Sequence, residues 1–487
     1  MNPSISFTEQ DLTLFSASSG DRNPLHLSAA YARGTAYGQP LVFGCLGAIA
    51  CLSQIVLPEG SEIRWLQAEF LRPVFAGVSY NIVASRVGDK WVSRLMDGSL
   101  PVVVLTVEPA SREGTMVEAS ALPPFFEHSE AVVRDESEIA PGLTITGRHS
   151  CDPVALEALG TRFSGISRHP WTSAVFACCS YLIGMELPGE SALFYSLVLG
   201  FAGTLPRQPV ALRYEASVQS VNHQIGLARI DISLFLDDRR IASGQAGSFI
   251  RPTLVAEPDS SVPIAASRDS LAGQTALVIG ASRGLGAAMA HALEARGATV
   301  YALSRSATGH GTAHGTGRAE SGDASDPDVL RRLRERILSE QGRLDILVCN
   351  ACPPVLPLRL EPNSLLRIEA YVTLAVGLTA APLCMFLDQL NLNDGAAVVI
   401  SSAAVERPVR DWPHYMAAKQ SVEMLARMAS LQYPRVGTLI VRPPKLLTVL
   451  TNTPMGRRGA SSPVEFASRI ASRLEQKLEP GKTEVLG

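Results

Sequence analysis

The 487-residue sequence predicts a multidomain protein, with an α+β N-terminal part made of two similar units and an α/β C-terminal domain with a doubly wound parallel sheet. Three observations support this. The chain is longer than a single hydrophobic core normally organises. An apolar, helix-like stretch followed by strand-like segments occurs twice in the first half, and the last third alternates short apolar strands with helical patterns.

The bulk composition is that of a globular protein. Hydrophobic residues make up 46% and charged residues 18%, and the formal net charge of −3 gives no reason to expect nucleic acid or an anionic membrane as a partner. The N-terminal residues lack the pattern of a secretion signal, and the longest apolar stretches, 41–57 and 370–387, contain polar residues and fall short of a membrane span. The eight cysteines lack the regular spacing of a disulfide-bonded domain, which favours a reducing compartment. We therefore expect a cytoplasmic protein.

The N-terminal repeat is visible in two apolar stretches. Leu41–Leu52 reads LVFGCLGAIACL and Ala174–Met185 reads AVFACCSYLIGM, and a Leu-Pro pair follows each. Strand-like segments then follow, at 68–70, 79–87 and 101–107 in the first copy and at 211–221, 228–236 and 240–250 in the second. The sequence therefore predicts two units, each a sheet wrapped around its own helix. We place them at 1–110 and 140–251, with a Ser/Glu/Pro-rich linker at 111–139.

The C-terminal domain is expected at 271–487, after a Pro/Ser/Asp-rich linker at 252–270. Helical patterns separate its short apolar strand candidates, which are 276–279, 300–303, 344–348, 397–400 and 437–441. Strands that alternate with helices in this way form a parallel sheet with helices on both faces, the Rossmann arrangement.

A glycine-rich loop opens this domain. The strand TALVIG runs directly into Gly280-Ala-Ser-Arg-Gly-Leu-Gly286 and then into a helix. Glycines are needed here because the backbone must turn tightly and approach a pyrophosphate, whose charge lies at the helix N-terminus. The loop predicts dinucleotide binding by Gly280, Ser282, Arg283, Gly284 and Gly286.

Further motifs extend this prediction. Tyr415-Met-Ala-Ala-Lys419 is a Tyr-x-x-x-Lys pair, and Ser402 stands thirteen residues before Tyr415 at the end of the strand AVVIS. Together with the glycine loop, these residues resemble the short-chain dehydrogenase/reductase family over roughly residues 271–474. The resemblance implies that Tyr415 gives a proton to a carbonyl oxygen while the cofactor gives a hydride. A phenol has a pKa near 10, so the Lys419 ammonium one turn away is needed to lower it. Ser402 would hydrogen-bond the substrate oxygen, and Lys419 would also reach the nicotinamide ribose.

The residues also indicate which nicotinamide cofactor is used. Arg305 follows the second strand, where an acidic residue would select NAD and an arginine suits the 2′-phosphate of NADP. Arg283 favours the same cofactor, by resemblance to NADP-dependent ketoacyl reductases. Asp323 matches the family's adenine-contacting aspartate, and Asn350 belongs to the loop after the fourth strand. We expect NADPH as the cofactor and no metal.

Three positions depart from the family pattern. The family's Asn-Asn-Ala-Gly is Cys349-Asn-Ala-Cys352 here, Tyr371 stands where the family has a catalytic asparagine, and Pro443-Pro444 replaces Pro-Gly. The Cys-x-x-Cys spacing has no second pair at zinc-finger distance, so we do not expect a metal or redox site there.

A second motif lies near the N-terminus. Ser19-Gly-Asp21-Arg-Asn-Pro-Leu-His26 resembles the signature of R-specific enoyl-CoA hydratases, the MaoC-like family of hotdog proteins. The resemblance implies a double hotdog fold in which Asp21 and His26 add or remove water at an acyl thioester. Removal of water needs a base for the α-proton and an acid for the leaving hydroxyl. A backbone N–H at Gly44 would hold the thioester oxygen, and Phe43 replaces the family's histidine before it. The alternative is a structural role, because Asp and Asn residues in such a run also form turns and cap the N-termini of helices.

The second unit lacks this aspartate, so residues 140–251 are expected to shape the substrate pocket. Together the motifs predict a bifunctional 3-ketoacyl-thioester reductase and 3-hydroxyacyl-thioester dehydratase of fatty-acid or polyketide-type biosynthesis. One alternative is an enzyme that runs these reactions in reverse, hydration and then oxidation, as β-oxidation enzymes do. Another is a scaffold or carrier-protein-docking subunit whose active sites have decayed. A reductase acting on an unrelated carbonyl is a third. The expected partner is an acyl thioester on CoA or a carrier protein, and the resemblance implies a homodimer or larger homo-oligomer.

Overall fold

The computed structural model describes residues 3–111, 124–202, 211–251, 269–305, 318–451 and 456–487. They form two compact units, one within 1–253 and the other from 254 onward. The predicted linker at 252–270 falls almost entirely outside the described residues. Of the predicted linker at 111–139, the described part from 124 contains a short strand, β6 (Phe125–Phe126), and a 3-10 turn at Glu136–Glu138.

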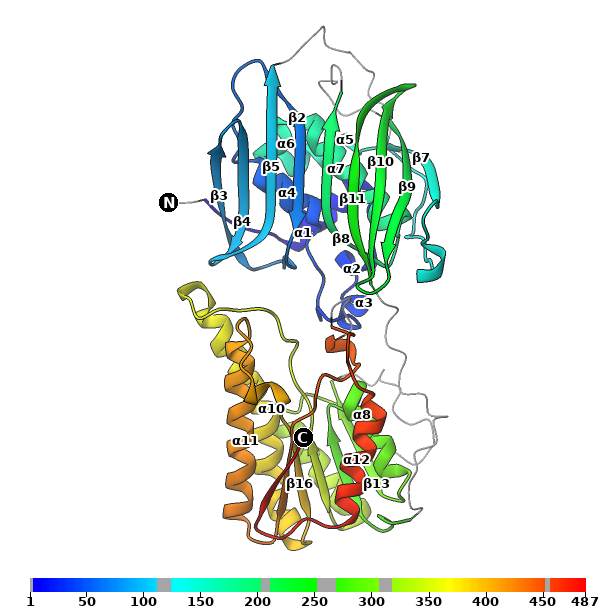
Figure 1. Ribbon diagram of the computed structural model, residues 1–487. Coiled ribbons are helices and arrows are strands. Elements are labelled where there is room, and N and C mark those ends of the chain that lie inside the picture. The colour runs from blue at the N-terminus through cyan, green and yellow to red at the C-terminus, as the bar shows by residue number, and fades with distance from the viewer. Residues whose placement is uncertain (1–2, 112–123, 203–210, 252–268, 306–317, 452–455) are drawn as a thin grey trace. The chain divides into compact units, whose positions relative to one another are not determined.

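The first unit is built on one antiparallel sheet of eleven strands (Figure 1). In chain order these are β1 (Ser4–Ser6), β2 (Ser61–Phe70), β3 (Ser79–Val87), β4 (Lys90–Asp97), β5 (Leu100–Ser111), β6, β7 (Thr144–Ser150), β8 (Ala192–Phe201), β9 (Leu212–Asn222), β10 (Leu227–Leu236) and β11 (Arg239–Ile250).

The order of the strands repeats itself about the centre of this sheet. Outward from the central pair β2–β8, one half runs β2-β5-β4-β3-β1 and the other runs β8-β11-β10-β9-β7. The predicted repeat is therefore present in the topology. The expectation of two separate sheets is wrong, because β2 and β8 pair from Trp65↔Gly200 to Glu69↔Ser196 and join the halves into one sheet.

Each half contains the apolar helix that the sequence predicts. The first half has α1 (Glu9–Ser19), α2 (Pro24–Leu27), α3 (Ala29–Arg33) and the central α4 (Gly44–Leu52). The second has α5 (Pro153–Gly160), α6 (Ser164–Arg168) and the central α7 (Pro170–Tyr181), which continues as a π-helical turn over Leu182–Glu186. Figure 1 shows these helices gathered on one side of the sheet.

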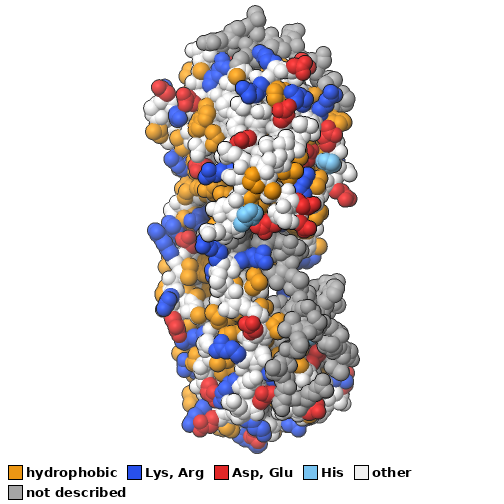
Figure 2. Space-filling view, turned by 45° about the vertical axis from the view of Figure 1, so that its right-hand side comes forward, with side chains coloured by type: hydrophobic (Ala, Val, Ile, Leu, Met, Phe, Trp, Pro, Cys, Tyr) orange, Lys and Arg blue, Asp and Glu red, His pale blue; other side chains and the backbone are white. Residues whose placement is uncertain are grey.

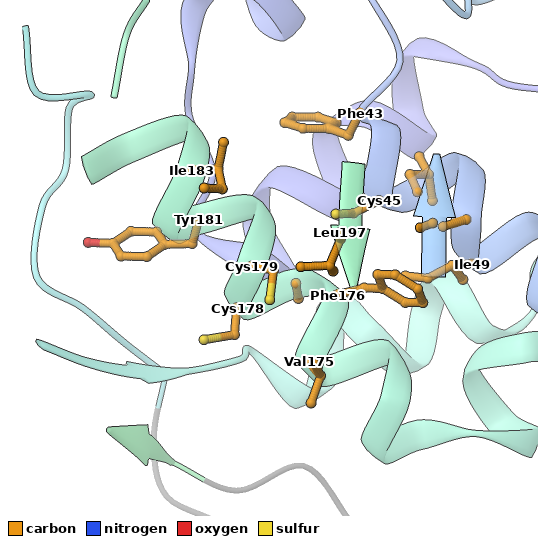
Figure 3. Packing of buried hydrophobic residues seen from close by; sticks show 14 of the residues in the cluster. Phe43, Cys45, Ile49, Val175, Phe176, Cys178, Cys179, Tyr181, Ile183 and Leu197 are labelled. Atoms are coloured by element: carbon orange, nitrogen blue, oxygen red, sulfur yellow. The ribbon is translucent and has the colours of Figure 1, made fainter. Parts of the chain in front are cut away.

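The two central helices form the middle of one hydrophobic core. Cys45 of α4 and Cys178 and Cys179 of α7 are fully buried there, and Figure 3 shows them packed among aliphatic and aromatic side chains. Tyr181 differs from its neighbours, because its hydroxyl points away from this packing (Figure 3). The apolar character of both stretches is thus explained by burial.

The second unit has the predicted doubly wound parallel sheet. Its strand order is β14-β13-β12-β15-β16-β17-β18, and all pairs are parallel. The strands are β12 (Thr275–Ile279), β13 (Thr299–Ser304), β14 (Arg318–Ser321), β15 (Ile346–Cys349), β16 (Ala396–Ile400), β17 (Gly437–Val441) and β18 (Thr483–Leu486). The two edge strands, β14 and β18, were not predicted from the sequence, because each has only four residues and lacks the continuous apolar run of the central strands.

Helices cover both faces of this sheet (Figure 1). One core contains α8 (Gly284–Glu294) and α12 (Pro463–Glu475), and the other contains α9 (Pro327–Gln341), α10 (Leu365–Leu392) and α11 (Pro413–Gln432). Alternate residues of β12 belong to different cores, with Val278 in the first and Leu277 in the second, as expected for a strand buried on both faces.

One helical segment, Pro362–Leu392, is long and apolar enough by length and composition to cross a membrane, although 39% of its most apolar window is buried. This differs from the expectation that the longest apolar stretches are not apolar enough to span a membrane. Its inner face packs on the parallel sheet through Leu378, Phe386 and Leu390, as a core helix does. Its outer face exposes Leu366 (76%) and Leu374 (41%). On the face seen in Figure 2, positive and negative side chains are interspersed.

Candidate active sites

The glycine loop connects β12 to α8 and is shaped by close backbone contacts. Gly280 and Gly284 have φ angles of +80° and +58°, a region that favours glycine. A Cβ on Gly280 would lie 2.8 Å from the backbone of Ala351, and one on Gly286 would lie 2.1 Å from the carbonyl oxygen of Gly280. Since no side chain fits at these positions, the loop presents bare backbone at the N-terminus of α8, and this cradle fits a dinucleotide pyrophosphate.

The other predicted cofactor residues lie around this loop. Asn350, directly after β15, donates from Nδ2 to the carbonyl oxygen of Gly280 at 3.0 Å and ties the loop to the neighbouring strand. Arg283 is exposed at the N-cap of α8, and Ser282 beside it is half-buried. Arg305 directly follows β13, which pairs with β12, so it lies at the same sheet edge as the loop.

Asp323 follows β14 at the same edge. Its Oδ1 accepts hydrogen bonds from the backbone N–H and the hydroxyl of Ser325, at 2.8 and 2.7 Å. These bonds keep the pKa of Asp323 below its usual value, and the charge of Arg305 acts in the same direction. The structure thus gathers the glycine loop, Arg305, Asp323 and Asn350 at the carboxyl ends of adjacent strands, where doubly wound sheets bind ligands.

The three predicted reductase residues also come together. Ser402 follows β16 by two residues, while Tyr415 and Lys419 lie one turn apart on α11. Lys419 is 7% exposed, its Nζ donates to the carbonyl oxygen of Ile400 at 2.8 Å, and it lies 5.7 Å from the centre of the Tyr415 ring. Burial raises the pKa of Tyr415, whereas the charge of Lys419 and a hydrogen bond with Ser402 act to lower it. The arrangement can present a hydroxyl group, with a neighbouring ammonium, to a carbonyl oxygen.

A buried ion pair supports this centre, and sequence analysis missed it. Glu423, 3% exposed, accepts from the Ser401 hydroxyl at 2.7 Å and from Arg442 Nε and Nη2 at 2.9 and 2.7 Å. Glu423 lies one turn after Lys419, and Arg442 directly follows β17. The network therefore fixes α11, which carries Tyr415 and Lys419, to the ends of β16 and β17. The one-turn spacing from Lys419 was the only signal in the sequence.

In the first unit, Asp21 lies in the loop between α1 and α2 and is 2% exposed. Its Oδ2 accepts a hydrogen bond from the Ser180 hydroxyl of α7 at 2.6 Å, and its Oδ1 accepts from the backbone N–H of Asn23 at 3.1 Å. Burial raises the pKa of Asp21 to about 7, although both hydrogen bonds act to lower it. This carboxyl group is therefore able to hold a proton near neutral pH.

The second half of the unit holds the Asp21 loop in place. Asn23 Nδ2 donates to the carbonyl oxygens of Gly184, Gly189 and Glu190 at 2.9, 3.2 and 3.1 Å. A Cβ on Gly184 would lie only 2.7 Å from each carboxylate oxygen of Asp21. The Asp21 loop thus packs so closely on the π-helical turn that no side chain fits at position 184. Ser180 and Gly184 belong to no motif, so their contacts with Asp21 were not predicted from the sequence.

His26 lies on α2, partly buried. Its Nδ1 is 2.9 Å from the carbonyl oxygen of Leu41, and its ring stacks on Phe43 with ring centres 4.0 Å apart. Burial lowers the pKa of His26 to about 4, and the charge of Arg251 acts in the same direction. The imidazole is therefore neutral near pH 7. Phe43 directly precedes Gly44, where α4 begins as predicted.

The equivalent loop of the second half carries no acid. Gly165 of α6 donates its backbone N–H to the Ser53 hydroxyl at 2.9 Å, and a Cβ on it would lie 2.7 Å from the carbonyl oxygen of Ile49. Each loop thus packs on the central helix of the other half, but only the first brings a carboxyl group to that contact.

Comparison with known proteins matches both regions. Residues 274–459 match the short chain dehydrogenase model. L-xylulose reductase of Mus musculus is 30% identical over 220 residues, which are 40% of this chain and 78% of that enzyme. The chain belongs to the short-chain dehydrogenase family. Residues 1–107 match the MaoC like domain, so this dehydrogenase carries a MaoC-like N-terminal domain.

Two further similarities concern the dehydrogenase region. The 3-oxoacyl-(acyl-carrier-protein) reductase of Escherichia coli is 40% identical over 83 residues, 16% of this chain and 34% of that enzyme. An alcohol dehydrogenase of the archaeon Thermococcus sibiricus, solved with 5-hydroxy-NADP, is 23% identical, and the match covers 44% of this chain and 95% of that structure with a TM-score of 0.39.

Proposed function

We propose that this short-chain dehydrogenase reduces a 3-ketoacyl thioester with NADPH and that its MaoC-like part removes water from the resulting 3-hydroxyacyl thioester. The observation that carries the proposal is the placement of Asp21 and His26 in the first unit, where Asp21 accepts a hydrogen bond from Ser180 and His26 stacks on Phe43 directly before α4. Burial raises the pKa of Asp21 to about 7 and lowers that of His26 to about 4, so one chain holds an acid and a base beside α4 as well as a carbonyl-reducing centre.

In the reductase half, the glycine loop between β12 and α8 would hold the nicotinamide cofactor, which would supply a hydride for the carbonyl carbon. Tyr415 then donates its hydroxyl proton to the carbonyl oxygen, and Ser402 hydrogen-bonds the same oxygen as its negative charge develops. Lys419 stabilises the phenolate that remains, since its ammonium lies close to the Tyr415 ring. Arg283 and Arg305, beside the glycine loop, support NADPH because a guanidinium binds a 2′-phosphate in two-point contact.

In the dehydratase half, neutral His26 removes the α-proton and protonated Asp21 gives its proton to the leaving hydroxyl group. The N-terminus of α4 at Gly44 supports the thioester oxygen as negative charge develops on it, because the first backbone N–H groups of a helix have no partner within the helix. Phe43 orients the His26 ring by stacking. Water and a 2-enoyl thioester leave.

The fold of the first unit supports this assignment as a double hotdog. The same five-strand order occurs twice, once with each of the two central helices. The first half carries Asp21 and His26, and we assign the acyl pocket to the second half. We propose the domain limits 1–110, 140–251 and 271–487, with linkers between them. We also propose that the protein is cytoplasmic and forms a homo-oligomer through the apolar outer face of α10. Its substrate would be a thioester of CoA or of a carrier protein, and the reactions would run in the direction of synthesis.

Product mass tests this proposal. The purified chain is mixed with NADPH and a short 3-ketoacyl thioester, as the CoA and as the carrier-protein form. We expect a gain of two mass units followed by the loss of water. A gain of two alone would refute the dehydratase assignment of Asp21 and His26. No change with either thioester would refute the thioester reductase.

A further inference from the structure

The turn that leads from the π-helical segment to β8 receives contacts from both ends of the segment that carries His26. Asn23 Nδ2 donates to the carbonyl oxygens of Gly189 and Glu190 at 3.2 and 3.1 Å. Tyr31, on α3, donates its hydroxyl proton to Oε1 of Glu190 at 3.2 Å. Since Asn23 precedes His26 and Tyr31 follows it, the segment 23–31 is tied to this turn on both sides of the proposed base.

Arg251 joins these two ties. It directly follows β11, and its Nη2 donates to the carbonyl oxygen of Glu190, the same oxygen that Asn23 contacts. Its Nη1 donates to the hydroxyl oxygen of Tyr31 at 3.2 Å, and its Nε donates to the carbonyl oxygen of Ala192 at 3.1 Å. The guanidinium also lies 5.4 Å from the centre of the Tyr31 ring. One side chain from the second half therefore holds both ends of the segment 23–31.

The burial of this arginine explains why its geometry matters. Arg251 is 8% exposed, and a buried charge is costly unless hydrogen bonds compensate for it. The planar fork of a guanidinium reaches several oxygen atoms at once, which a lysine ammonium on a flexible stem does not match. The charge of Arg251 also acts to lower the pKa of His26, as expected for a guanidinium close to that base.

Asn23 connects these ties to the acid and to the base. Its backbone N–H donates to Oδ1 of Asp21 at 3.1 Å. Its own Oδ1 accepts from the backbone N–H of Leu25 at 3.1 Å and caps α2, the helix that carries His26. A shift of Asn23 must therefore move Asp21 and His26 relative to one another.

We propose that Arg251 and Tyr31 are positioning residues of the dehydratase centre, a clamp that holds the segment 23–31 on the second half of the unit and so fixes the spacing of Asp21 and His26. This inference rests on the proposed dehydration. An acid and a base that act on one substrate must both lie within hydrogen-bond reach of it, and a displacement of about 1 Å lowers the rate by about 10²-fold. Loss of the clamp should therefore lower kcat for dehydration more than it raises KM.

The kinetics of dehydration by the full chain are the first test. Tyr31→Phe keeps the ring beside the guanidinium but lacks the hydroxyl group, and it should lower kcat by about 10-fold. Arg251→Lys keeps the positive charge but cannot hold Glu190 and Tyr31 together, and it should lower kcat by a similar factor. Because the two substitutions break a shared contact, the double variant should lose less than the product of the two losses. Losses that multiply in full would overturn the clamp.

Arg162 provides the matched control. It is another arginine of the first unit, and it binds the carbonyl oxygen of Ser6 at 2.9 Å and the carboxylate of Asp11 at 2.8 Å. Arg162→Lys weakens these contacts without touching the segment 23–31, so it should leave kcat unchanged. An equal fall of kcat in Arg162→Lys and Arg251→Lys would refute a specific role for Arg251.

Hydrogen–deuterium exchange separates this inference from the proposed function, because it needs no substrate. The backbone N–H groups of Leu25 and His26 bond to Asn23 at 3.1 and 3.0 Å. Tyr31→Phe and Arg251→Lys should each speed exchange in the peptide 22–31 by about 2- to 10-fold, whereas Arg162→Lys should not. A chain that dehydrates no thioester but shows this faster exchange would refute the proposed dehydratase and retain the clamp. A dehydratase whose kcat is the same in both variants as in the wild type would refute the positioning role alone.

Discussion

The hydroxyl of Ser180 donates a hydrogen bond to Oδ2 of Asp21 at 2.6 Å, and both side chains are buried. Ser180 lies on the central helix of one half of the eleven-stranded sheet, and Asp21 lies in a loop of the other half. The second half therefore does more than complete the fold, because it supplies the hydrogen bond that counteracts the effect of burial on the pKa of Asp21.

Replacing Ser180 by Ala should raise the pKa of Asp21. The hydroxyl stabilises the ionised carboxylate, and a hydrogen bond to a charged group contributes about 1.5–3 kcal/mol, so its loss should raise the pKa by about 1–2 units. As Asp21 acts as the acid in dehydration, the alkaline limit of that reaction should move up. Dehydration of a 3-hydroxyacyl thioester across pH 5–9 measures it.

Ser173 offers the control for this substitution. It lies on the same helix, is fully buried, and its hydroxyl has no hydrogen-bond partner. Ser173→Ala should leave the pH profile in place. Equal profiles for both variants would show that the Ser180 bond does not govern Asp21.

Gly184→Ala tests the fit between the π-helical turn and the Asp21 loop. The added methyl group would lie 2.7 Å from both carboxylate oxygens, so Asp21 must move. Dehydration should fall by about 10²-fold, a loss typical for a displaced acid–base group, while carbonyl reduction in the other unit should persist. Parallel assays with the 3-hydroxyacyl and 3-ketoacyl thioesters measure both. A fall in the two activities together would indicate a general folding defect instead.

The pH dependence of dehydration follows from the two pKa values. His26 must be neutral to act as a base, so activity should be lost as the pH falls through about 4. Asp21 must be protonated to act as an acid, so activity should be lost as the pH rises through about 7. The profile of kcat/KM should therefore be bell-shaped between these limits. Asp21→Asn should remove the alkaline limb together with most of the activity, and an unchanged alkaline limb in that variant would assign it to another group.

The distances along the sequence explain which features could be predicted. The glycine loop, Ser402, Tyr415 and Lys419 were predictable because their spacing along the chain resembles the motifs of the short-chain dehydrogenase/reductase family. The Asp21–Ser180 bond joins residues 159 positions apart and depends on the antiparallel pairing of β2 with β8. The edge strands β14 and β18 were missed because an edge strand is not buried on both faces and so lacks the apolar run that identified the central ones. The hydroxyl oxygen of Tyr371 lies 3.5 Å from Sγ of Cys352, a contact that required the fold, since only the sheet brings the β15 loop to α10.

Arg305 tests the preference for NADPH. If its guanidinium binds the 2′-phosphate, Arg305→Ser should lower kcat/KM for NADPH by about 10- to 100-fold and change the value for NADH much less. Steady-state reduction with each cofactor gives the ratio. Arg331→Ser is a matched control, because Arg331 is an exposed arginine on α9 that pairs with Asp328. A wild type that prefers NADH would support the oxidative, β-oxidation type of function.

The Glu423 network predicts how the stability of the second unit depends on pH. The hydrogen bonds of Glu423 to Arg442 and Ser401 outweigh the effect of burial and lower its pKa in the folded state. Its ionisation therefore stabilises the fold above the unfolded pKa of about 4.3, and this contribution is lost as the pH falls through the lower folded value. Glu423→Gln leaves the guanidinium of Arg442 without its buried partner and should lower the free energy of unfolding by about 1–3 kcal/mol at pH 7.

Urea unfolding of the full chain at pH 7 and at pH 4 measures this difference. Glu406→Gln is the matched control, because Glu406 bonds to the same Arg442 at 2.8 Å but is 62% exposed, and it should change stability by less than about 1 kcal/mol. The two variants should differ most at pH 7 and converge at low pH, where the wild-type Glu423 also becomes protonated. Equal losses for both variants at pH 7 would show that the exposed carboxylate contributes as much as the buried one.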